Sequence, residues 1–196
     1  IGVRLVGSEM CIRDRFSLAV TLNSNAFQRC ISPECGATFS PENVLVSCPT
    51  CGDLLDIDYE WDRLKVPKQL SDFESYWADR YLPHRFSGVW RFHELLPFVA
   101  PEDIVTIGEG QTLLQRAERV ANYVGVASKN LYLQYEGMNP SGSFKDNGMT
   151  AAFTHARATG ATQAACASTG NTSASLALYS CMTRKMRAII FVGSGK

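Results

Sequence analysis

Lys145 lies in a sequence setting in which a lysine amine can do chemistry. Residues 130–135 form a strand-like run, and the segment Glu136-Gly-Met-Asn-Pro-Ser-Gly-Ser-Phe-Lys-Asp146 turns from it into a helix expected over 144–159. Ser143 takes the expected N-cap position, which puts Lys145 beside unpaired N–H groups at the positive end of the helix dipole. An ammonium is disfavoured there, and a neutral amine less so. This setting suits a reactive lysine, but the spacing alone is equally that of a surface lysine that happens to begin a helix.

A second loop has the composition of an anion-binding turn. Ser168-Thr-Gly-Asn-Thr-Ser173 lies between a strand expected over 163–168 and a helix expected over 172–183. Backbone N–H groups and hydroxyls at the start of a helix can hold an anion such as a carboxylate. An ordinary N-cap loop has the same composition, so this motif alone leaves both interpretations open.

Taken together, the two motifs resemble those of a known enzyme family. The segments 139–146 and 168–175 resemble the pyridoxal-phosphate enzymes of the tryptophan-synthase-like fold, and within that group the threonine synthases. The resemblance runs from about Phe27 to Lys196 and includes Gly108-Glu-Gly-Gln-Thr112. It is specific because the motifs occur in the same order, each at a strand-to-helix turn.

The resemblance implies a reaction and roles for individual residues. Lys145 would bind pyridoxal 5'-phosphate covalently and act as the general base and acid, with Phe144 near the cofactor ring and Asn171 at its ring hydroxyl. O-phospho-L-homoserine and water would give L-threonine and phosphate, the reaction of a carbon–oxygen lyase of threonine biosynthesis. The implied substrate-binding residues are Thr112, Ser141, Ser143, Asn147, Ser168, Thr169, Gly170 and Thr172.

Three positions depart from the pattern of the relatives. Thr112-Leu-Leu replaces a common Thr-Pro-Leu, Ser141 stands where Thr is frequent, and Asn147 replaces an arginine in a site expected to bind phosphate. The loss of a cation leaves open another enzyme of the same fold, such as a threonine or serine dehydratase or a cysteate synthase. Thr112 is equally suited to cap a helix expected over 113–123.

Four cysteines upstream have the spacing of a metal site. Cys30-x4-Cys35 and Cys48-x2-Cys51 place two pairs on short turns, and four thiolates make a tetrahedral zinc site. Short strands are expected at 38–39 and 44–46, which together predict a zinc-ribbon-like module with a structural zinc. A redox-active Cys48-x2-Cys51 is the alternative. Some threonine synthases carry such a ribbon, so the module agrees with the resemblance.

The charges around the cysteines bear on a nucleic-acid partner, which zinc ribbons often have. Acidic residues outnumber basic ones over 28–65, and this argues against binding a phosphate backbone. A non-enzymatic zinc-ribbon binding module nevertheless stays open as a third kind of function. The acidic residues are Glu34, Glu42, Asp53, Asp56, Asp58, Glu60 and Asp62, against Arg29, Arg63 and Lys65.

Composition narrows the classes of function. The chain is 45% hydrophobic and 19% charged with a net charge of +0, typical of a globular protein with no bulk attraction to nucleic acid or anionic membranes. No apolar run approaches the ~18 residues that a membrane span needs. The cysteine usage suggests a reducing, cytoplasmic compartment. We expect a small-molecule substrate and no nucleic-acid or membrane partner, and a homodimer is compatible with the resemblance.

The order of motifs predicts the organisation of the chain. Residues 1–15 resemble vector read-through, 16–65 form the zinc-ribbon-like module, 66–105 a helical connector with helices over 71–81 and 88–96, and 106–196 part of a catalytic domain. From residue 130, strands and helices alternate, with strands at 131–135, 163–168 and 187–192. This predicts an α/β fold with an open, mainly parallel sheet of the tryptophan-synthase β-like type.

That sheet places the two motifs in one site. Ligands of open α/β sheets bind outside the carboxyl ends of the strands, where the 136–146 and 168–173 loops are expected. Only three of its strands are identified, so we expect a fragment whose ligands to the cofactor phosphate and pyridine nitrogen lie beyond residue 196. Such a fragment would be inactive alone.

Overall fold

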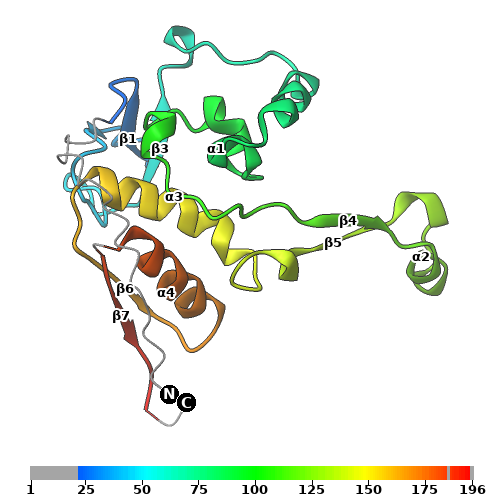
Figure 1. The fold of residues 1–196 in the computed structure, drawn as a ribbon. Helices are drawn as coiled ribbons and strands as arrows, with labels where there is room; N and C mark the ends of the chain where they lie inside the picture. The colour runs from blue at the N-terminus through cyan, green and yellow to red at the C-terminus, as the bar shows by residue number, and fades with distance from the viewer. Residues whose placement is uncertain (1–21, 185, 195–196) are drawn as a thin grey trace, which may run out of the picture.

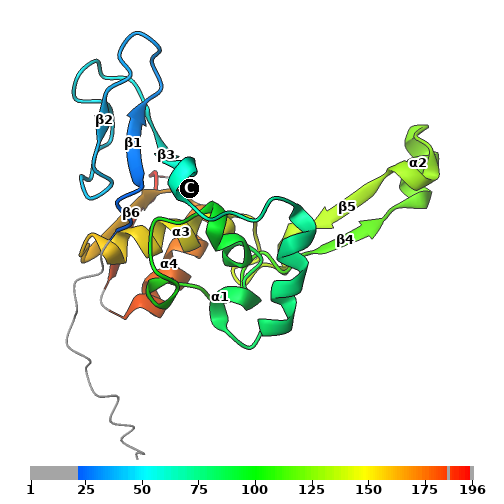
Figure 2. The ribbon, with the colours of Figure 1, turned by 90° about the horizontal axis from the view of Figure 1, so that it is seen from above.

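A computed structural model describes residues 22–184 and 186–194 of the chain. Figures 1 and 2 show a small sheet formed by β1, β2 and β3, a connector of short helices, a hairpin that projects from the body, and an α/β unit formed by the last described residues. The segment 1–15, expected to be read-through, lies outside the described residues. Among the helices that the structure describes, none combines the length and apolar character needed to cross a bilayer.

The C-terminal unit alternates helix and strand as expected. It consists of α3 (Lys145–Ala158), β6 (Gln163–Ala167), α4 (Asn171–Thr183) and β7 (Arg187–Phe191). β6 and β7 pair in parallel, from Gln163 opposite Arg187 to Ala167 opposite Phe191. The predicted helices and the parallel pairing of these two strands are therefore confirmed. Their core is formed by Val105, Phe153, Leu176, Tyr179 and Met186.

The strand before the lysine motif belongs to a different sheet from the one predicted. β5 (Tyr132–Tyr135) pairs antiparallel with β4 (Leu113–Arg116), and the two form the hairpin that projects from the body in Figures 1 and 2. Both strands are exposed along their length. The strand predicted at 131–135 is present as β5, but its predicted parallel pairing is wrong. Parallel strands are normally covered on both faces, whereas β5 is exposed.

The helix expected over 113–123 is correspondingly shorter. Residues 113–116 form β4, and α2 (Glu118–Val124) begins two residues later and ends at Gly125, whose φ of 73° suits a helix C-terminus. Apolar residues at 113, 114 and 117 match a helical period, but pairing with β5 prevails over it. The 3₁₀ helix η5 (Ser128–Asn130) completes the tip of the hairpin.

The cysteine-rich segment is built on a small antiparallel sheet. β1 (Ala26–Cys30) is its central strand, flanked by β2 (Thr38–Phe39) and β3 (Leu55–Tyr59). The strand expected at 38–39 is confirmed. The strand expected at 44–46 is wrong, since these residues lie in an exposed loop where Val46 is 93% exposed and no strand is left to pair with them.

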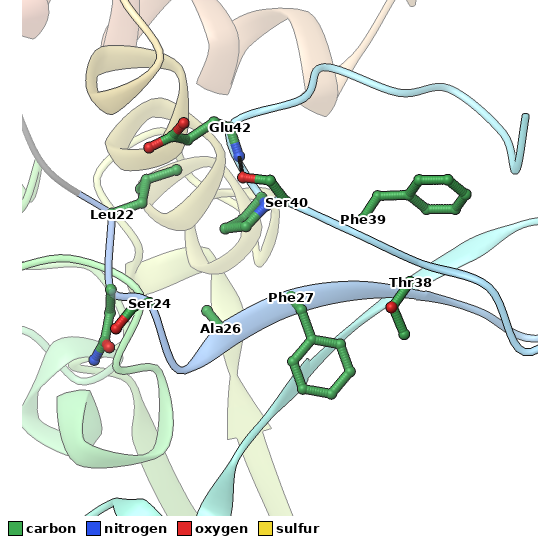
Figure 3. Close-up of a pocket in the computed structure, with 10 residues that line it drawn as sticks. Leu22, Ser24, Ala26, Phe27, Thr38, Phe39, Ser40 and Glu42 are labelled. Carbon is green, nitrogen blue, oxygen red and sulfur yellow. Dashed lines mark hydrogen bonds between the residues drawn. The ribbon is translucent and has the colours of Figure 1, made fainter.

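An apolar cluster joins this sheet to the rest of the chain. Trp90 is fully buried among Leu22, Ala26, Phe98 and Val99, and two alanines of α3 pack against them. Beside the cluster, an open pocket of about 560 Å³ is lined by residues 22–24, 26–27 and 38–42 (Figure 3). None of the residues implied in catalysis or metal binding lines it, so the pocket is separate from the candidate sites.

The connector consists of short helices, most of them 3₁₀. They are η1 (Trp61–Arg63), η2 (Leu70–Asp79), α1 (Pro83–Phe86), η3 (Trp90–Leu95) and η4 (Pro101–Asp103). The helices expected over 71–81 and 88–96 correspond to η2 and η3. Both are shorter than predicted and of the tighter 3₁₀ type, and η3 is kinked at Phe92, which has non-helical backbone angles.

An ion pair inside the connector makes a pH-dependent contribution to stability. Arg85 binds Glu94 at 2.9 Å and stacks over the Tyr76 ring at 3.8 Å. Burial by itself would raise the pKa of Glu94, but the hydrogen bond from Arg85 outweighs it and the pKa is lowered. The stabilisation is therefore present above the ordinary glutamate pKa of about 4.3 and is lost as pH falls through the lowered value.

We expect Glu94→Gln to destabilise the protein by about 1 kcal/mol at pH 7, because partial solvent access screens the pair. The cost should vanish in acid, at a pH below the lowered pKa of Glu94, where both forms are neutral. Urea unfolding at the two pH values measures this, with the exposed Glu74→Gln as control. An equal cost at both pH values would contradict the electrostatic origin.

Candidate active site

Lys145 is the first residue of α3, at the end of the turn that follows β5. Its N–H donates to Ser143 Oγ at 3.3 Å, and its Nζ lies 4.7 Å from the centre of the Phe144 ring. Phe144 is 54% exposed, so this ring and the amine face an accessible surface. The N-cap residue is Phe144, one residue after the predicted Ser143. The Ser143 hydroxyl still accepts a hydrogen bond from an N–H at the helix end, that of Lys145.

Glu136 gathers several implied substrate residues around the same turn. It begins the 3₁₀ helix η6 (Glu136–Met138), and its carboxylate contacts Asn147 Nδ2 at 3.4 Å and Thr112 Oγ1 at 3.5 Å. Asn139 donates to Glu136 Oε2 at 2.8 Å and accepts from the Gly110 N–H at 2.8 Å. These bonds bring Thr112, from the end of the 108–112 loop, next to the turn before Lys145.

Two polar atoms in this turn have no hydrogen-bond partner within the described part of the chain. Ser141 Oγ and Asn147 Oδ1 are both shielded from solvent and unpaired. Buried polar atoms are almost always hydrogen-bonded, so each unpaired atom needs an explanation. Both belong to residues implied in substrate binding, and a bound polar ligand would satisfy them.

The second loop leads into α4 with its donors open. Thr169, Gly170 and Asn171 are exposed, and the Gly170 N–H donates to Ser168 Oγ at 3.2 Å. Within the described residues, no side chain caps the N-terminus of α4. The helix dipole and the free N–H groups at this end favour an anion.

The structure brings the two loops together through their helices. α3 and α4 pack side by side and run in the same direction, so that their N-termini lie at one end of the unit (Figure 1). Ser175 Oγ of α4 donates to Asp146 Oδ1 of α3. The expected proximity of the motifs therefore arises from helix packing, whereas the prediction derived it from neighbouring strands of one sheet.

A buried carboxylate that the sequence analysis assigns no role lies beneath the site. Glu109 is fully buried and accepts hydrogen bonds from Ser87, Thr106, the Ile107 N–H and Tyr179, the last at 2.6 Å. It anchors the 108–112 loop to the connector and to α4. The acid between two glycines is the only local signal for it, because its burial depends on contacts far along the chain.

We expect Tyr179→Phe to lower the free energy of unfolding by about 1–3 kcal/mol, since it removes a donor from a buried carboxylate. Burial, followed by the charge of Glu109, raises the pKa of Tyr179, so the hydroxyl stays protonated and donates. Denaturant unfolding measures the change, with Tyr123→Phe as control because Tyr123 is 92% exposed. Equal losses in the two variants would contradict the role of this bond.

The four cysteines converge as their spacing predicts. Their sulfur atoms all lie within 4.8 Å of one another, with Cys30 and Cys51 3.4 Å apart and Cys35 and Cys48 3.7 Å apart. Zn–S bonds of about 2.3 Å in a tetrahedron place the sulfurs about 3.8 Å apart. Gly36 and Gly52 follow the second cysteine of each pair with φ of 56° and 86°, as a knuckle turn requires.

The acidity of Cys48 also suits a metal ligand. Burial by itself raises the pKa of this thiol, but the backbone N–H groups of Cys51 and Thr50 and the neighbouring thiols lower it to about 6. The thiolate is the form that binds metal. The closest sulfur contacts join one pair to the other, which fits a four-ligand site better than a Cys48-x2-Cys51 redox pair.

Comparisons with known proteins agree with the motifs. The family model described as pyridoxal-phosphate dependent enzyme matches residues 105–196. The chain is 43% identical over 151 residues to a threonine synthase of Methanosarcina acetivorans, which covers 77% of this chain and 33% of the relative. It is 40% identical over 169 residues to a threonine synthase of Methanocaldococcus jannaschii, covering 86% of this chain and 38% of the relative.

A shorter match has a higher identity. Over 75 residues the chain is 52% identical to a threonine synthase of Mycobacterium leprae, which covers 38% of this chain and 20% of the relative. The chain thus spans about a third of the length of the first two curated relatives. The segment that the family model matches, residues 105–196, contains Lys145, both motif loops and the packed pair of helices.

Proposed function

We propose that this chain is part of a threonine synthase that converts O-phospho-L-homoserine and water to L-threonine and phosphate. The observation that carries the proposal is the proximity of two motif loops at the paired N-termini of α3 and α4, one with Lys145 and one with open N–H donors. The relatives named threonine synthase support the choice of reaction. A non-enzymatic zinc module does not account for the match over 105–196.

The residues present fit pyridoxal phosphate. The Lys145 amine lies over the accessible Phe144 ring. Ser141 Oγ and Asn147 Oδ1 are buried without a hydrogen-bond partner among the described residues, and a polar ligand would supply one. When bound, pyridoxal phosphate draws electrons from the α carbon of an amino-acid substrate. Lys145 would hold it covalently, Phe144 would pack near the ring, and the exposed Asn171 side chain would reach the ring hydroxyl.

Lys145 would then do the proton chemistry. Its side chain starts from the first turn of α3, and this tether would keep the amine near the reacting carbons. It would take protons from the α and β carbons as phosphate leaves the γ carbon, and protons would return to the γ and α carbons as water adds at the β carbon.

Other residues would hold the substrate. The exposed turn 168–172 offers N–H groups at the start of α4 for the substrate carboxylate, with Ser168, Thr169, Gly170 and Thr172 contributing. Ser141, Ser143 and Asn147 would contact its phosphate. Thr112, tied to Glu136, would close the opposite side of the site.

The four-cysteine cluster would bind a structural zinc. The convergence of the four sulfurs supports Zn²⁺ held by Cys30, Cys35, Cys48 and Cys51. The small sheet around them buries few apolar side chains, so metal binding would supply much of its folding free energy.

One observation favours a second candidate reaction. Asn147 occupies a position where a cation would aid phosphate binding, and its amide is turned toward the Glu136 carboxylate. A dehydratase acting on serine or threonine has no substrate phosphate to bind at this position. It would share the lysine chemistry, as would a cysteate synthase. The substrate therefore has to be decided by assay.

The test is phosphate release from O-phosphohomoserine by the full-length protein that carries this chain. Equal amounts of phosphate and threonine would establish the reaction. If pyridoxal phosphate binds but no phosphate is released, the reaction is wrong, and serine, threonine and phosphoserine are the next substrates to assay. A protein that binds no pyridoxal phosphate would overturn the proposal as a whole.

A further inference from the structure

A buried carboxylate joins the two loops of the candidate site. Asp146, the second residue of α3, is 0% exposed. Its Oδ2 accepts a hydrogen bond from the Ser141 N–H at 2.7 Å, and its Oδ1 accepts one from Ser175 Oγ. Ser141 lies in the turn before Lys145, whereas Ser175 lies in the second turn of α4.

These contacts differ from those of an ordinary helix cap. A capping-box acid would bond back to the N–H of the N-cap residue, but Asp146 reaches Ser141 on one side and a different helix on the other. No ion pair with Asp146 forms among the described residues. The carboxylate is therefore satisfied only by these two donors and by the positive end of the α3 dipole.

We propose that Asp146 is a positioning residue, which holds the turn bearing Ser141 and Lys145 in register with the N-terminal end of α4. The inference rests on the proposed function, because that register matters only if the two loops act on one ligand. Both carboxylate oxygens are engaged by the protein, so Asp146 acts through its neighbours. A shift of about 1 Å in a reacting group can lower a rate about 10²-fold.

A second hydroxyl group of α4 donates to another buried carboxylate. Tyr179 lies one turn beyond Ser175 on α4 and donates to Glu109, which anchors the 108–112 loop. Ser175 and Tyr179 of α4 thus donate hydrogen bonds to two buried carboxylates. One of them, Asp146, directly follows Lys145, and the other, Glu109, belongs to the 108–112 loop. α4 begins in the 168–173 loop, and through these two hydrogen bonds it also holds the 136–146 turn and the 108–112 loop.

The test compares Asp146→Asn, Ser175→Ala and the double variant in the full-length protein, with the exposed Asp79→Asn as control. Pyridoxal phosphate binding is followed by absorbance, phosphate release gives kcat and KM, and urea unfolding is measured on the apo form. We expect Asp146→Asn to weaken cofactor binding about tenfold and to lower kcat about 10²-fold with little change in KM. The double variant should be no worse than Asp146→Asn, because Ser175 acts through Asp146.

Two results would overturn the inference. One is cofactor affinity and kcat within about twofold of the parent in Asp146→Asn; the other is a loss fully explained by unfolding of the apo form under assay conditions. If the parent itself binds no pyridoxal phosphate, the proposed function fails. Hydrogen exchange then tests separately whether Asp146 holds the turn that bears Ser141 against α4. Faster exchange of the Ser141 N–H in Asp146→Asn supports the tie, and unchanged exchange contradicts it.

Discussion

Replacing Lys145 with alanine is expected to lower phosphate release from O-phosphohomoserine by about 10³-fold or more, because one side chain supplies both the covalent attachment and the proton transfers. The residue lies at the N-terminus of α3 beside the exposed Phe144 ring, with no other lysine in either motif loop. Lys145→Arg should lose activity to a similar extent, since a guanidinium keeps the charge but offers no nucleophilic amine.

The measurement pairs the assay with chemical trapping. Borohydride treatment of the parent with pyridoxal phosphate should fix the cofactor to the peptide that contains Lys145, and mass spectrometry locates it. Lys129→Ala is the matched control, because Lys129 is exposed at the tip of the hairpin. Labelling at another lysine, or more than a tenth of the parent rate in Lys145→Ala, would remove Lys145 from the mechanism.

Removing the proposed zinc is expected to unfold the cysteine-rich sheet over residues 22–59. The four sulfurs converge from two turns, and structural zinc sites of this type have apparent binding free energies of about 10–16 kcal/mol. Cys48→Ser should have the same effect as a strong chelator, since Cys48 is 2% exposed and its thiolate is favoured by neighbouring N–H groups.

Native mass spectrometry should find one zinc per chain in the parent and none in Cys48→Ser. Hydrogen exchange over residues 22–59 then reports the loss of structure, with Cys181→Ser as control because Cys181 is exposed on α4 and far from the cluster in sequence. Loosening should extend to the neighbouring contact between His155 and the Pro41 carbonyl, 2.7 Å apart. A metal-free protein that keeps β1–β3 protected would rule out a structural zinc.

Elements with strong local signals were predictable. The helix that begins at Lys145 follows a turn with proline and glycines, and it was expected at 144–159 against the observed Lys145–Ala158. β6 and β7 are short apolar runs on either side of α4, and their parallel pairing follows from the connecting helix. In each case, a few neighbouring residues carry the signal.

Strand pairing at the hairpin was not predictable from such signals. Leu113 and Leu114 fit a helical stripe, but their partners Tyr135 and Gln134 lie about twenty residues along the chain. Because pairing depends on long-range hydrogen bonds, local periodicity misassigned β4 as helix and led to the wrong pairing for β5. The 44–46 run failed for the same reason, since an apolar run becomes a strand only where a partner strand is available.

The sequence by itself determined which groups are present for chemistry: Lys145 at a helix start, an open hydroxyl- and amide-rich loop at 168–173, and four cysteines in two pairs. Only the tertiary structure decided how they meet. α3 and α4 bring the loops together, and Asp146 and Glu109 are buried with donors from distant segments. The physical reason is that spacing reports backbone conformation over a few residues, whereas burial and hydrogen bonding of a charged group depend on residues that only the folded chain brings into contact.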